Sequence, residues 1–209
     1  MKIGVIDLGI NNYRSVMNAF DRLISDEDQL VAVQDGSSDF AADLVVLPGL
    51  GHFESGMNAL RKTRLSEYIF QRNQAHSKIV GICLGMQLLG TSSEEAPGVD
   101  GLNLVGATSI KLPSSSRVPH IGWNSVIEFG KNESFPSLSA QNDFYFVHSF
   151  HMSMKDDSHI LTQTPFGETR FTSSLICQNI AGFQFHPEKS GSAGSELLSD
   201  IYKWATLST

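Results

Sequence analysis

Cys83 is the first candidate for a catalytic residue. It stands between Gly81 and Gly85, where an apolar run meets a helical pattern. A Gly-x-nucleophile-x-Gly turn between a strand and a helix pushes the nucleophilic side chain out of the backbone, and its small neighbours let a substrate approach closely. A position at the start of a helix also favours a thiolate and offers free N–H groups to an oxyanion. A lone cysteine is more often a buried structural residue, so a nucleophile needs a partner elsewhere in the chain.

His186 is the candidate for that partner, about a hundred residues further along the chain. It follows the apolar run 180–185 and precedes Pro187, which indicates the end of a buried strand. Sites of α/β proteins assemble at the ends of strands. Glu188 lies two residues further on, so in an extended backbone its carboxylate projects to the same side and can orient the imidazole. Cys83, His186 and Glu188 therefore form a candidate catalytic triad.

Two upstream segments fit the same chemistry. Residues 48–53 form a glycine-punctuated turn after the apolar strand 43–47, and the N–H groups of such a turn are free to face a developing oxyanion. Residues 145–150 indicate a buried strand that delivers polar groups at its end. Each segment is weak evidence alone, because most Pro-Gly-x-Gly runs are only turns.

Three of these segments together resemble the class I, triad-type glutamine amidotransferases: Pro-Gly-Leu-Gly at 48–51, Gly-Ile-Cys-Leu-Gly-Met-Gln at 81–87 and Gln-Phe-His-Pro-Glu at 184–188. Within that class, the segments 119–124, 145–149 and 189–190 are similar to those of the glutaminase subunit of imidazole glycerol phosphate synthase. The similarity runs nearly from end to end.

The resemblance implies a reaction and a set of residues for it. Cys83 would attack the side-chain amide of glutamine and form a γ-glutamyl thioester, His186 would protonate the leaving ammonia and then activate water, and Glu188 would orient His186. Backbone N–H groups near Leu84 and Leu50 would stabilise the oxyanion. The substrate-binding residues implied are Gly49, Leu50, Gly51, Leu84, Gln87, Ser149 and Phe150.

The resemblance also implies a partner. The ammonia would pass into a barrel-shaped cyclase subunit of a heterodimer and join a phosphoribosyl-type nucleotide intermediate there. Asn12, Trp123 and Lys189 match interface positions. In the family the turn at 48–51 rearranges when the partner and its ligand are present, so we expect poor activity of the chain alone.

The chain departs from the family at Leu8 and Asn11, where Asp-Tyr-Gly-x-Gly-Asn is usual, and at Phe150, where tyrosine is common. Asparagine can adopt the left-handed conformation that a glycine would supply, so the N-terminal turn can survive. Two alternatives stay open. One is a paralogous subunit that supplies ammonia to another synthase, such as one for surface-sugar amidation. The other is a degenerate module that binds a partner without catalysis.

Composition limits the remaining function classes. The net charge of −7 and the pI near 5.4 argue against a nucleic-acid surface, which needs clustered Lys and Arg. No apolar stretch approaches the roughly 20 residues of a membrane span. No Walker or dinucleotide fingerprint and no metal-ligand spacing is present, so we expect no cofactor and no metal. The adjacent Glu94 and Glu95 are interpreted as a solvated helix end.

The N-terminus and the cysteines bear on location. Met1 leads almost directly into an apolar strand, which leaves no room for a secretory signal. Only Cys83 and Cys177 are present, too few for a disulfide framework, and a reducing compartment suits a working thiolate. We therefore expect a cytoplasmic protein with a single glutamine amidotransferase domain over residues 1–209.

The elements that must position these residues alternate between strand and helix, as the crossovers of a parallel sheet require. Asn12 can cap the first helix, and a closing amphipathic helix is expected after Gly194. The predicted fold class is α/β, with a flavodoxin-like, mostly parallel sheet flanked by helices and additional antiparallel strands in the C-terminal half. The expected strands are 3–7, 30–33, 43–47, 78–82, 104–112, 124–129, 143–150, 159–164, 174–178 and the run 180–185.

Overall fold

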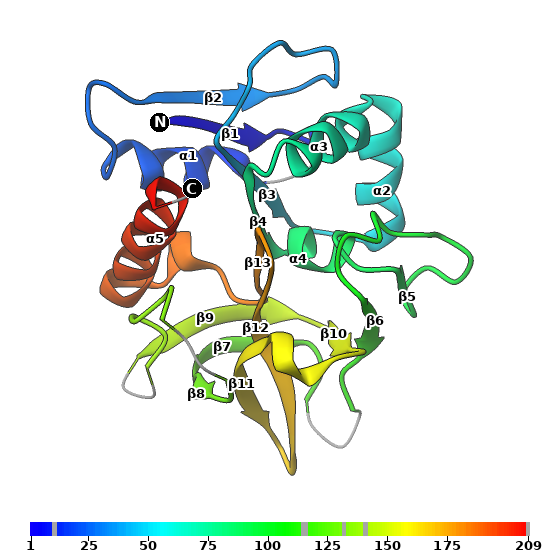
Figure 1. Ribbon diagram of the computed structural model, residues 1–209. Coiled ribbons are helices and arrows are strands. Elements are labelled where there is room, and N and C mark those ends of the chain that lie inside the picture. Colours follow the sequence, from blue (N-terminus) through cyan, green and yellow to red (C-terminus); the bar gives the residue numbers. More distant parts are fainter. Residues whose placement is uncertain (10–11, 114–116, 131–132, 140–141, 208–209) are drawn as a thin grey trace.

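The parallel part of the sheet comes mainly from the N-terminal half of the chain. The computed structural model describes residues 1–9, 12–113, 117–130, 133–139 and 142–207 (Figure 1). Apolar residues dominate the central strands because a parallel sheet is buried on both faces. The strands lie in the order β2-β1-β3-β4-β13, and each neighbouring pair is parallel. Their bounds are β1 (Lys2–Ile6), β2 (Gln29–Val33), β3 (Leu44–Gly49), β4 (Lys78–Cys83) and β13 (Ile180–Phe183).

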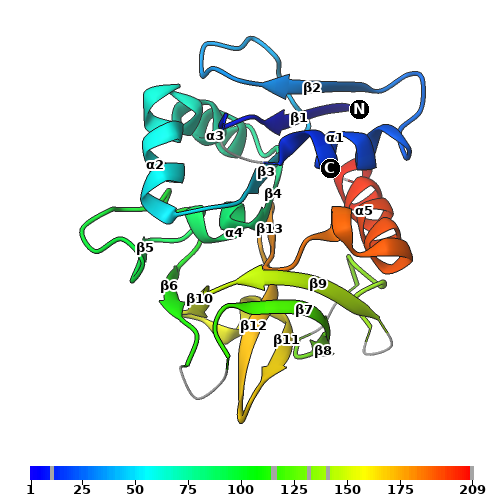
Figure 2. The ribbon, with the colours of Figure 1, turned by 180° about the vertical axis from the view of Figure 1, so that it is seen from behind.

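Helices cover both faces of this sheet (Figure 1, Figure 2). Along β3 the side chains alternate between the two faces, so Val46 packs in one hydrophobic cluster while Val45 and Leu47 pack in the other. The Val46 cluster includes residues of α1 (Tyr13–Asp21) and α5 (Gly191–Thr206). The second cluster includes residues of α2 (Phe53–Lys62), α3 (Leu65–Gln74) and α4 (Leu84–Leu88).

The later part of the chain adds antiparallel strands beside β13. There β12 pairs with β13, β10 and β11, and β10 also pairs with β6. A separate antiparallel hairpin joins β7 and β9, and the short strands β5 and β8 pair with β6 and β11. The predicted fold class is therefore confirmed. The bounds are β5 (Ser92–Ser93), β6 (Ala107–Lys111), β7 (His120–Ser125), β8 (Ile127–Glu128), β9 (Asp143–His148), β10 (Phe150–Met154), β11 (Ile160–Phe166) and β12 (Thr169–Cys177), with 3-10 turns η1 (Asp157–His159) and η2 (Pro187–Lys189).

Several predicted boundaries were wrong. The strand expected at 124–129 is divided between β7 and β8, and β7 begins at His120. Gly122, with φ of +133°, weakens the strand signal at that end. The closing helix begins at Gly191, one turn before Gly194. Asn12 does stand at the N-cap of α1, but its side chain accepts a bond from the Ser15 hydroxyl (2.7 Å) and caps no backbone N–H.

Asn11, one of the departures from the family pattern, lies outside the described residues. Among the helices that the structure describes, none combines the length and the hydrophobicity that a membrane crossing requires.

Close backbone contact between β3 and α4 sets the position of Cys83. A Cβ atom placed on Gly85 would lie 1.7 Å from the Leu47 carbonyl oxygen, and one on Gly81 would lie 2.6 Å from the Met86 Cα. Any larger residue at either position would therefore push α4 away from the sheet. The two glycines let the helix start directly beneath the strand ends.

We predict that Gly85→Ala destabilises the fold, because the new methyl group meets backbone that cannot move without displacing α4. The expected loss is about 3 kcal/mol, equivalent to a fall in Tm of roughly 6–12 °C for a chain of this size. Thermal unfolding followed by circular dichroism measures it. Gly106→Ala is the matched control, since its Cβ would meet only the flexible Lys155 side chain at 3.9 Å. Equal Tm values for the two variants would contradict the close-packing argument.

Candidate active site

Cys83 is the last residue of β4 and the N-cap residue of α4. Its φ of 54° and ψ of −110° are unusual for a residue with a side chain, and such strain persists only where the surrounding structure enforces it. Gly81 and Gly85 let α4 pack directly against the backbone of the strands, and this close packing holds Cys83 in its conformation. The turn is therefore the strand-to-helix elbow that the Gly-x-Cys-x-Gly spacing predicted.

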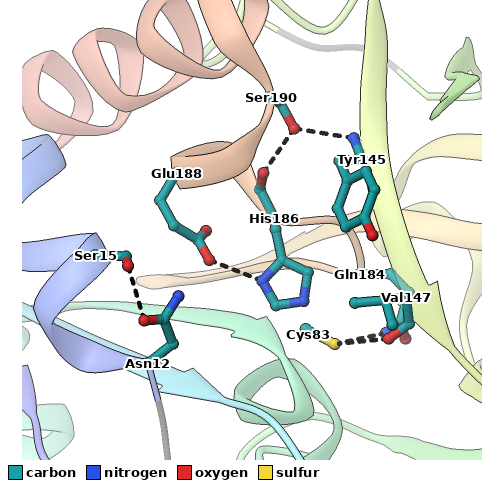
Figure 3. Close-up of polar contacts among 9 residues, drawn as sticks. All are labelled: Asn12, Ser15, Cys83, Tyr145, Val147, Gln184, His186, Glu188 and Ser190. Carbon is teal, nitrogen blue, oxygen red and sulfur yellow. Dashed lines mark hydrogen bonds and ion pairs between the residues drawn. The ribbon is translucent and has the colours of Figure 1, made fainter. Parts of the chain in front are cut away.

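His186 is held by the backbone of the β7–β9 hairpin. Its N–H donates to the Tyr145 carbonyl (2.9 Å), and its own carbonyl accepts a bond from the Ser190 hydroxyl (2.6 Å). The Ser190 oxygen in turn accepts the Tyr145 N–H (3.0 Å) (Figure 3). These bonds tie the segment after β13 to β9, so the imidazole is fixed from a strand outside the parallel sheet.

The three triad residues are brought together. His186 Nδ1 bonds Glu188 Oε1 at 2.8 Å, and both side chains are 2% exposed. An ionised carboxylate only accepts hydrogen bonds, so Nδ1 carries the proton. Figure 3 shows the other ring nitrogen on the side of Cys83. That nitrogen, Nε2, is buried and has no hydrogen-bond partner within the described part of the chain, and it is free to exchange a proton with the thiol.

The electrostatics favour an ion pair. Burial opposes the charged imidazolium, but the negative charge of Cys83 and the bond to Glu188 outweigh it and raise the pKa of His186 to about 10. At neutral pH His186 therefore carries a positive charge beside Cys83, and a neighbouring imidazolium is the kind of group that activates a cysteine nucleophile.

A cavity of about 200 Å³ opens beside Cys83. Six of the seven predicted substrate-binding residues line it, whereas Gly49 is buried in β3, where it pairs with Cys83. Gly49 supports the elbow from behind because its Cβ position is filled by Leu84 and the Gly85 nitrogen. The cavity is lined by Leu50, Gly51, Cys83, Leu84, Gln87, Glu95, Pro119, Val147, His148, Ser149 and Phe150.

Gln87 is fixed in the cavity wall. Its Nε2 donates to the Phe150 carbonyl (2.8 Å) and to Gln184 Oε1 (3.1 Å), so both amide hydrogens are used inside the protein. Its Oε1 is then the atom that can accept a bond from a ligand. The predicted position of Gln87 behind Cys83 agrees with this arrangement.

Glu95 is a residue that the sequence interpretation missed. It lies in a turn after β5, not at a solvated helix end as expected, and it is the acidic side chain in the cavity wall. Its Oε2 accepts the N–H of Phe53, at 2.7 Å, at the positive N-terminal end of α2. No local pattern could have indicated this, because the contact joins segments 42 residues apart. Glu94 points elsewhere and accepts the Lys111 N–H.

The residues expected at a partner interface lie on the surface. Trp123 is 57% exposed on β7, where its ring forms a T-shaped pair with Tyr145, and Lys189 is exposed on η2. Asn12 is half-buried at the start of α1 and lies on the Glu188 side of the triad (Figure 3). Ile121, two residues before Trp123 on the same face of β7, is 60% exposed and extends this apolar surface.

Several known proteins are similar to this chain in sequence. A family model described as glutamine amidotransferase class-I matches residues 10–204. Imidazole glycerol phosphate synthase subunit HisH of Thermotoga maritima is 38% identical over 205 residues, with 96% of each chain covered. The subunit of the same name from Methanopyrus kandleri is 39% identical over 208 residues, and the aligned region covers 99% of this chain and 100% of that subunit.

A solved structure agrees with the fold. PurLQS from Thermotoga maritima covers 97% of this chain and 98% of its own, with a TM-score of 0.73 at 18% identity. The resemblance that the motifs indicated is thus confirmed by whole-chain similarity. The chain belongs to the class I glutamine amidotransferases, in the group of the imidazole glycerol phosphate synthase subunits HisH.

Proposed function

We propose that this protein is the glutaminase subunit of imidazole glycerol phosphate synthase, which hydrolyses glutamine and supplies the ammonia to a cyclase partner in histidine biosynthesis. One observation carries the proposal above the others: Glu188 holds one imidazole nitrogen of His186 while the other faces Cys83 at the wall of the cavity. A module that only binds a partner has no need for this charge arrangement.

The reaction follows from the proton positions. The Cys83 thiolate attacks the side-chain amide carbon of glutamine, and the His186 imidazolium gives its Nε2 proton to the departing nitrogen, which leaves as ammonia. His186 then takes a proton from water, which attacks the thioester and releases glutamate. Glu188 keeps the Nδ1 proton in place and stabilises the imidazolium in both steps. Backbone N–H groups of Leu84 and of the Leu50 turn are assigned to the oxyanion.

Substrate recognition uses polar groups of the cavity wall. Glutamine carries an ammonium group, and Glu95 is the carboxylate that the cavity wall offers to it. Gln87 Oε1 accepts a further bond from the substrate, and the Ser149–Phe150 segment closes that side. Phe150 contributes its backbone there, so a phenylalanine in place of the tyrosine usual in the family preserves this contact.

A partner surface is proposed around the exposed Trp123, together with Ile121, Lys189 and Asn12. The relatives are named as subunits of a synthase, which supports a partner chain. A barrel-type cyclase docked there would sit over the Glu188 side of the triad and receive the ammonia away from water. Exposed aromatic and apolar residues of this kind are typical of binding surfaces.

We expect glutamate release from glutamine to be slow for the protein alone and strongly stimulated by a cyclase subunit of imidazole glycerol phosphate synthase with its nucleotide ligand. A coupled glutamate dehydrogenase assay measures the rate. Cys83→Ala is the control: it should bind the cyclase in a pull-down and release no glutamate. Activity that ignores the cyclase would redirect the search to another synthase, and turnover by Cys83→Ala would refute the thioester mechanism.

Replacing Glu188 should cost less activity than replacing His186. We expect Glu188→Gln to lower kcat by roughly 10–100-fold and His186→Ala by roughly 1000-fold or more, because an orienting group is less indispensable than the acid and base itself. Saturating glutamine and the cyclase complex are used for both variants. Equal losses would show that Glu188 does more than orient the imidazole.

Glu95→Gln should raise the KM for glutamine by roughly 10–100-fold with little change in kcat, since it removes a charge-assisted bond to the substrate before and during the reaction. The amide keeps an oxygen that can still accept the Phe53 N–H, so the fold should be retained. Glu94→Gln is the matched control because Glu94 is exposed and bonds Lys111 instead. An unchanged KM in Glu95→Gln would remove Glu95 from the substrate site.

A further inference from the structure

Gln184 brings a buried amide to the nucleophile. It follows β13, has no exposed surface, and its sequence neighbours Phe183 and Phe185 are fully buried as well. Its Nε2 is 3.7 Å from Cys83 Sγ, and Figure 3 shows the amide directed toward the sulfur. A primary amide in such a place must find partners for its polar atoms, or its burial would be strongly unfavourable.

The orientation of this amide is determined by its other neighbour. Gln184 Oε1 accepts a bond from Gln87 Nε2 (3.1 Å), and the same Gln87 nitrogen is held by the Phe150 carbonyl (2.8 Å). Turning the Gln184 amide over would place two N–H donors against each other and an oxygen against the sulfur. The bond from Gln87 therefore fixes Nε2 on the side of Cys83.

The ionised sulfur needs such a donor. In the neutral state the Cys83 thiol donates to the Val147 carbonyl, 3.9 Å away. When the proton moves from the sulfur to His186 Nε2, that carbonyl oxygen faces a negative charge. The helix that begins after Cys83 has only five residues, so its dipole offsets little of this repulsion.

We propose that Gln184 is a further catalytic residue, whose side-chain amide donates a hydrogen bond to the Cys83 sulfur and stabilises the thiolate before and during attack on glutamine. The inference rests on the proposed function only in that both use the same nucleophile. His186 balances the charge of the sulfur from one side, and Gln184 supplies a fixed dipole from another. Hydrogen bonds to charged groups are stronger than those between neutral groups.

The other ionisable groups around the sulfur do not replace this donor. Glu188 acts through His186, and Glu95 stands in the cavity wall with a negative charge. His148 also lines the cavity, but burial lowers its pKa to about 3, so it is neutral at physiological pH. Its Nδ1 bonds the Phe150 carbonyl and its Nε2 bonds His120. Both nitrogens of His148 are thus used elsewhere.

The test measures the thiolate directly. The rate of carboxamidomethylation of Cys83 by iodoacetamide is followed against pH in the full chain without glutamine or a cyclase, and mass spectrometry separates Cys83 from Cys177. We expect Gln184→Met to raise the apparent pKa of the Cys83 thiol by about one unit, because the charged thiolate loses one hydrogen bond. Glutaminase activity plays no part in the readout, so a failure of the proposed function would not be mistaken for a failure of this inference.

Gln87→Met is the comparison variant, because it removes the bond that orients the Gln184 amide but keeps that amide beside the sulfur. The apparent pKa of Cys83 should therefore rise less in Gln87→Met than in Gln184→Met. If Gln184→Met does not unfold cooperatively on heating, Gln184→Glu takes its place and should shift the profile further upward, since it puts a negative charge beside the sulfur. An unchanged profile, or equal shifts in the Gln184 and Gln87 variants, would overturn the proposal.

Discussion

The contact between the start of α4 and the Leu47 carbonyl is the constraint on which the site depends. Because Gly85 has no side chain, the helix begins against the backbone of β3, and Cys83 is forced into a conformation with positive φ that turns its sulfur toward the cavity. The strain at Cys83 is maintained by packing on both sides, with Gly49 behind the elbow. The places of Leu84 and Gln87 in the cavity wall then follow, since both residues are carried by the same short helix.

A second constraint comes from outside the parallel sheet. His186 lies in the segment after β13, and its backbone is bonded to Tyr145 on β9 and to Ser190. The position of the imidazole therefore depends on the β7–β9 hairpin. His186 and the exposed apolar surface at Trp123 thus both depend on this hairpin, since Tyr145 on β9 holds the His186 backbone and Trp123 lies on β7. The proposed acid–base residue and the proposed partner surface are therefore linked through a common element, while Cys83 is held by the parallel strands.

The sequence predicted the parts of the site that local signals encode. Cys83 was indicated by its flanking glycines, and His186 and Glu188 by a strand end and a two-residue spacing, and the structure brings all three together. Glu95 was misinterpreted because its role as a cavity residue arises from a contact with the distant Phe53, which no periodicity records. The α/β fold was predicted from the alternation of elements, whereas the bounds of β7 were missed because Gly122 interrupts its strand pattern. Local motifs can therefore be identified in a single sequence, whereas contacts between distant segments cannot.

Polar side chains join the two halves of the site into one chain of hydrogen bonds. Asn124 bonds His120 (3.2 Å), His120 bonds His148 (3.1 Å), and His148 and Gln87 share the Phe150 carbonyl before Gln184 reaches the sulfur. Such a network is favourable only when every member is satisfied, because each unpaired buried group is costly. A displacement of the hairpin must therefore be absorbed by at least one of these bonds. The wall of the cavity and the environment of Cys83 depend in this way on the strand that carries Trp123.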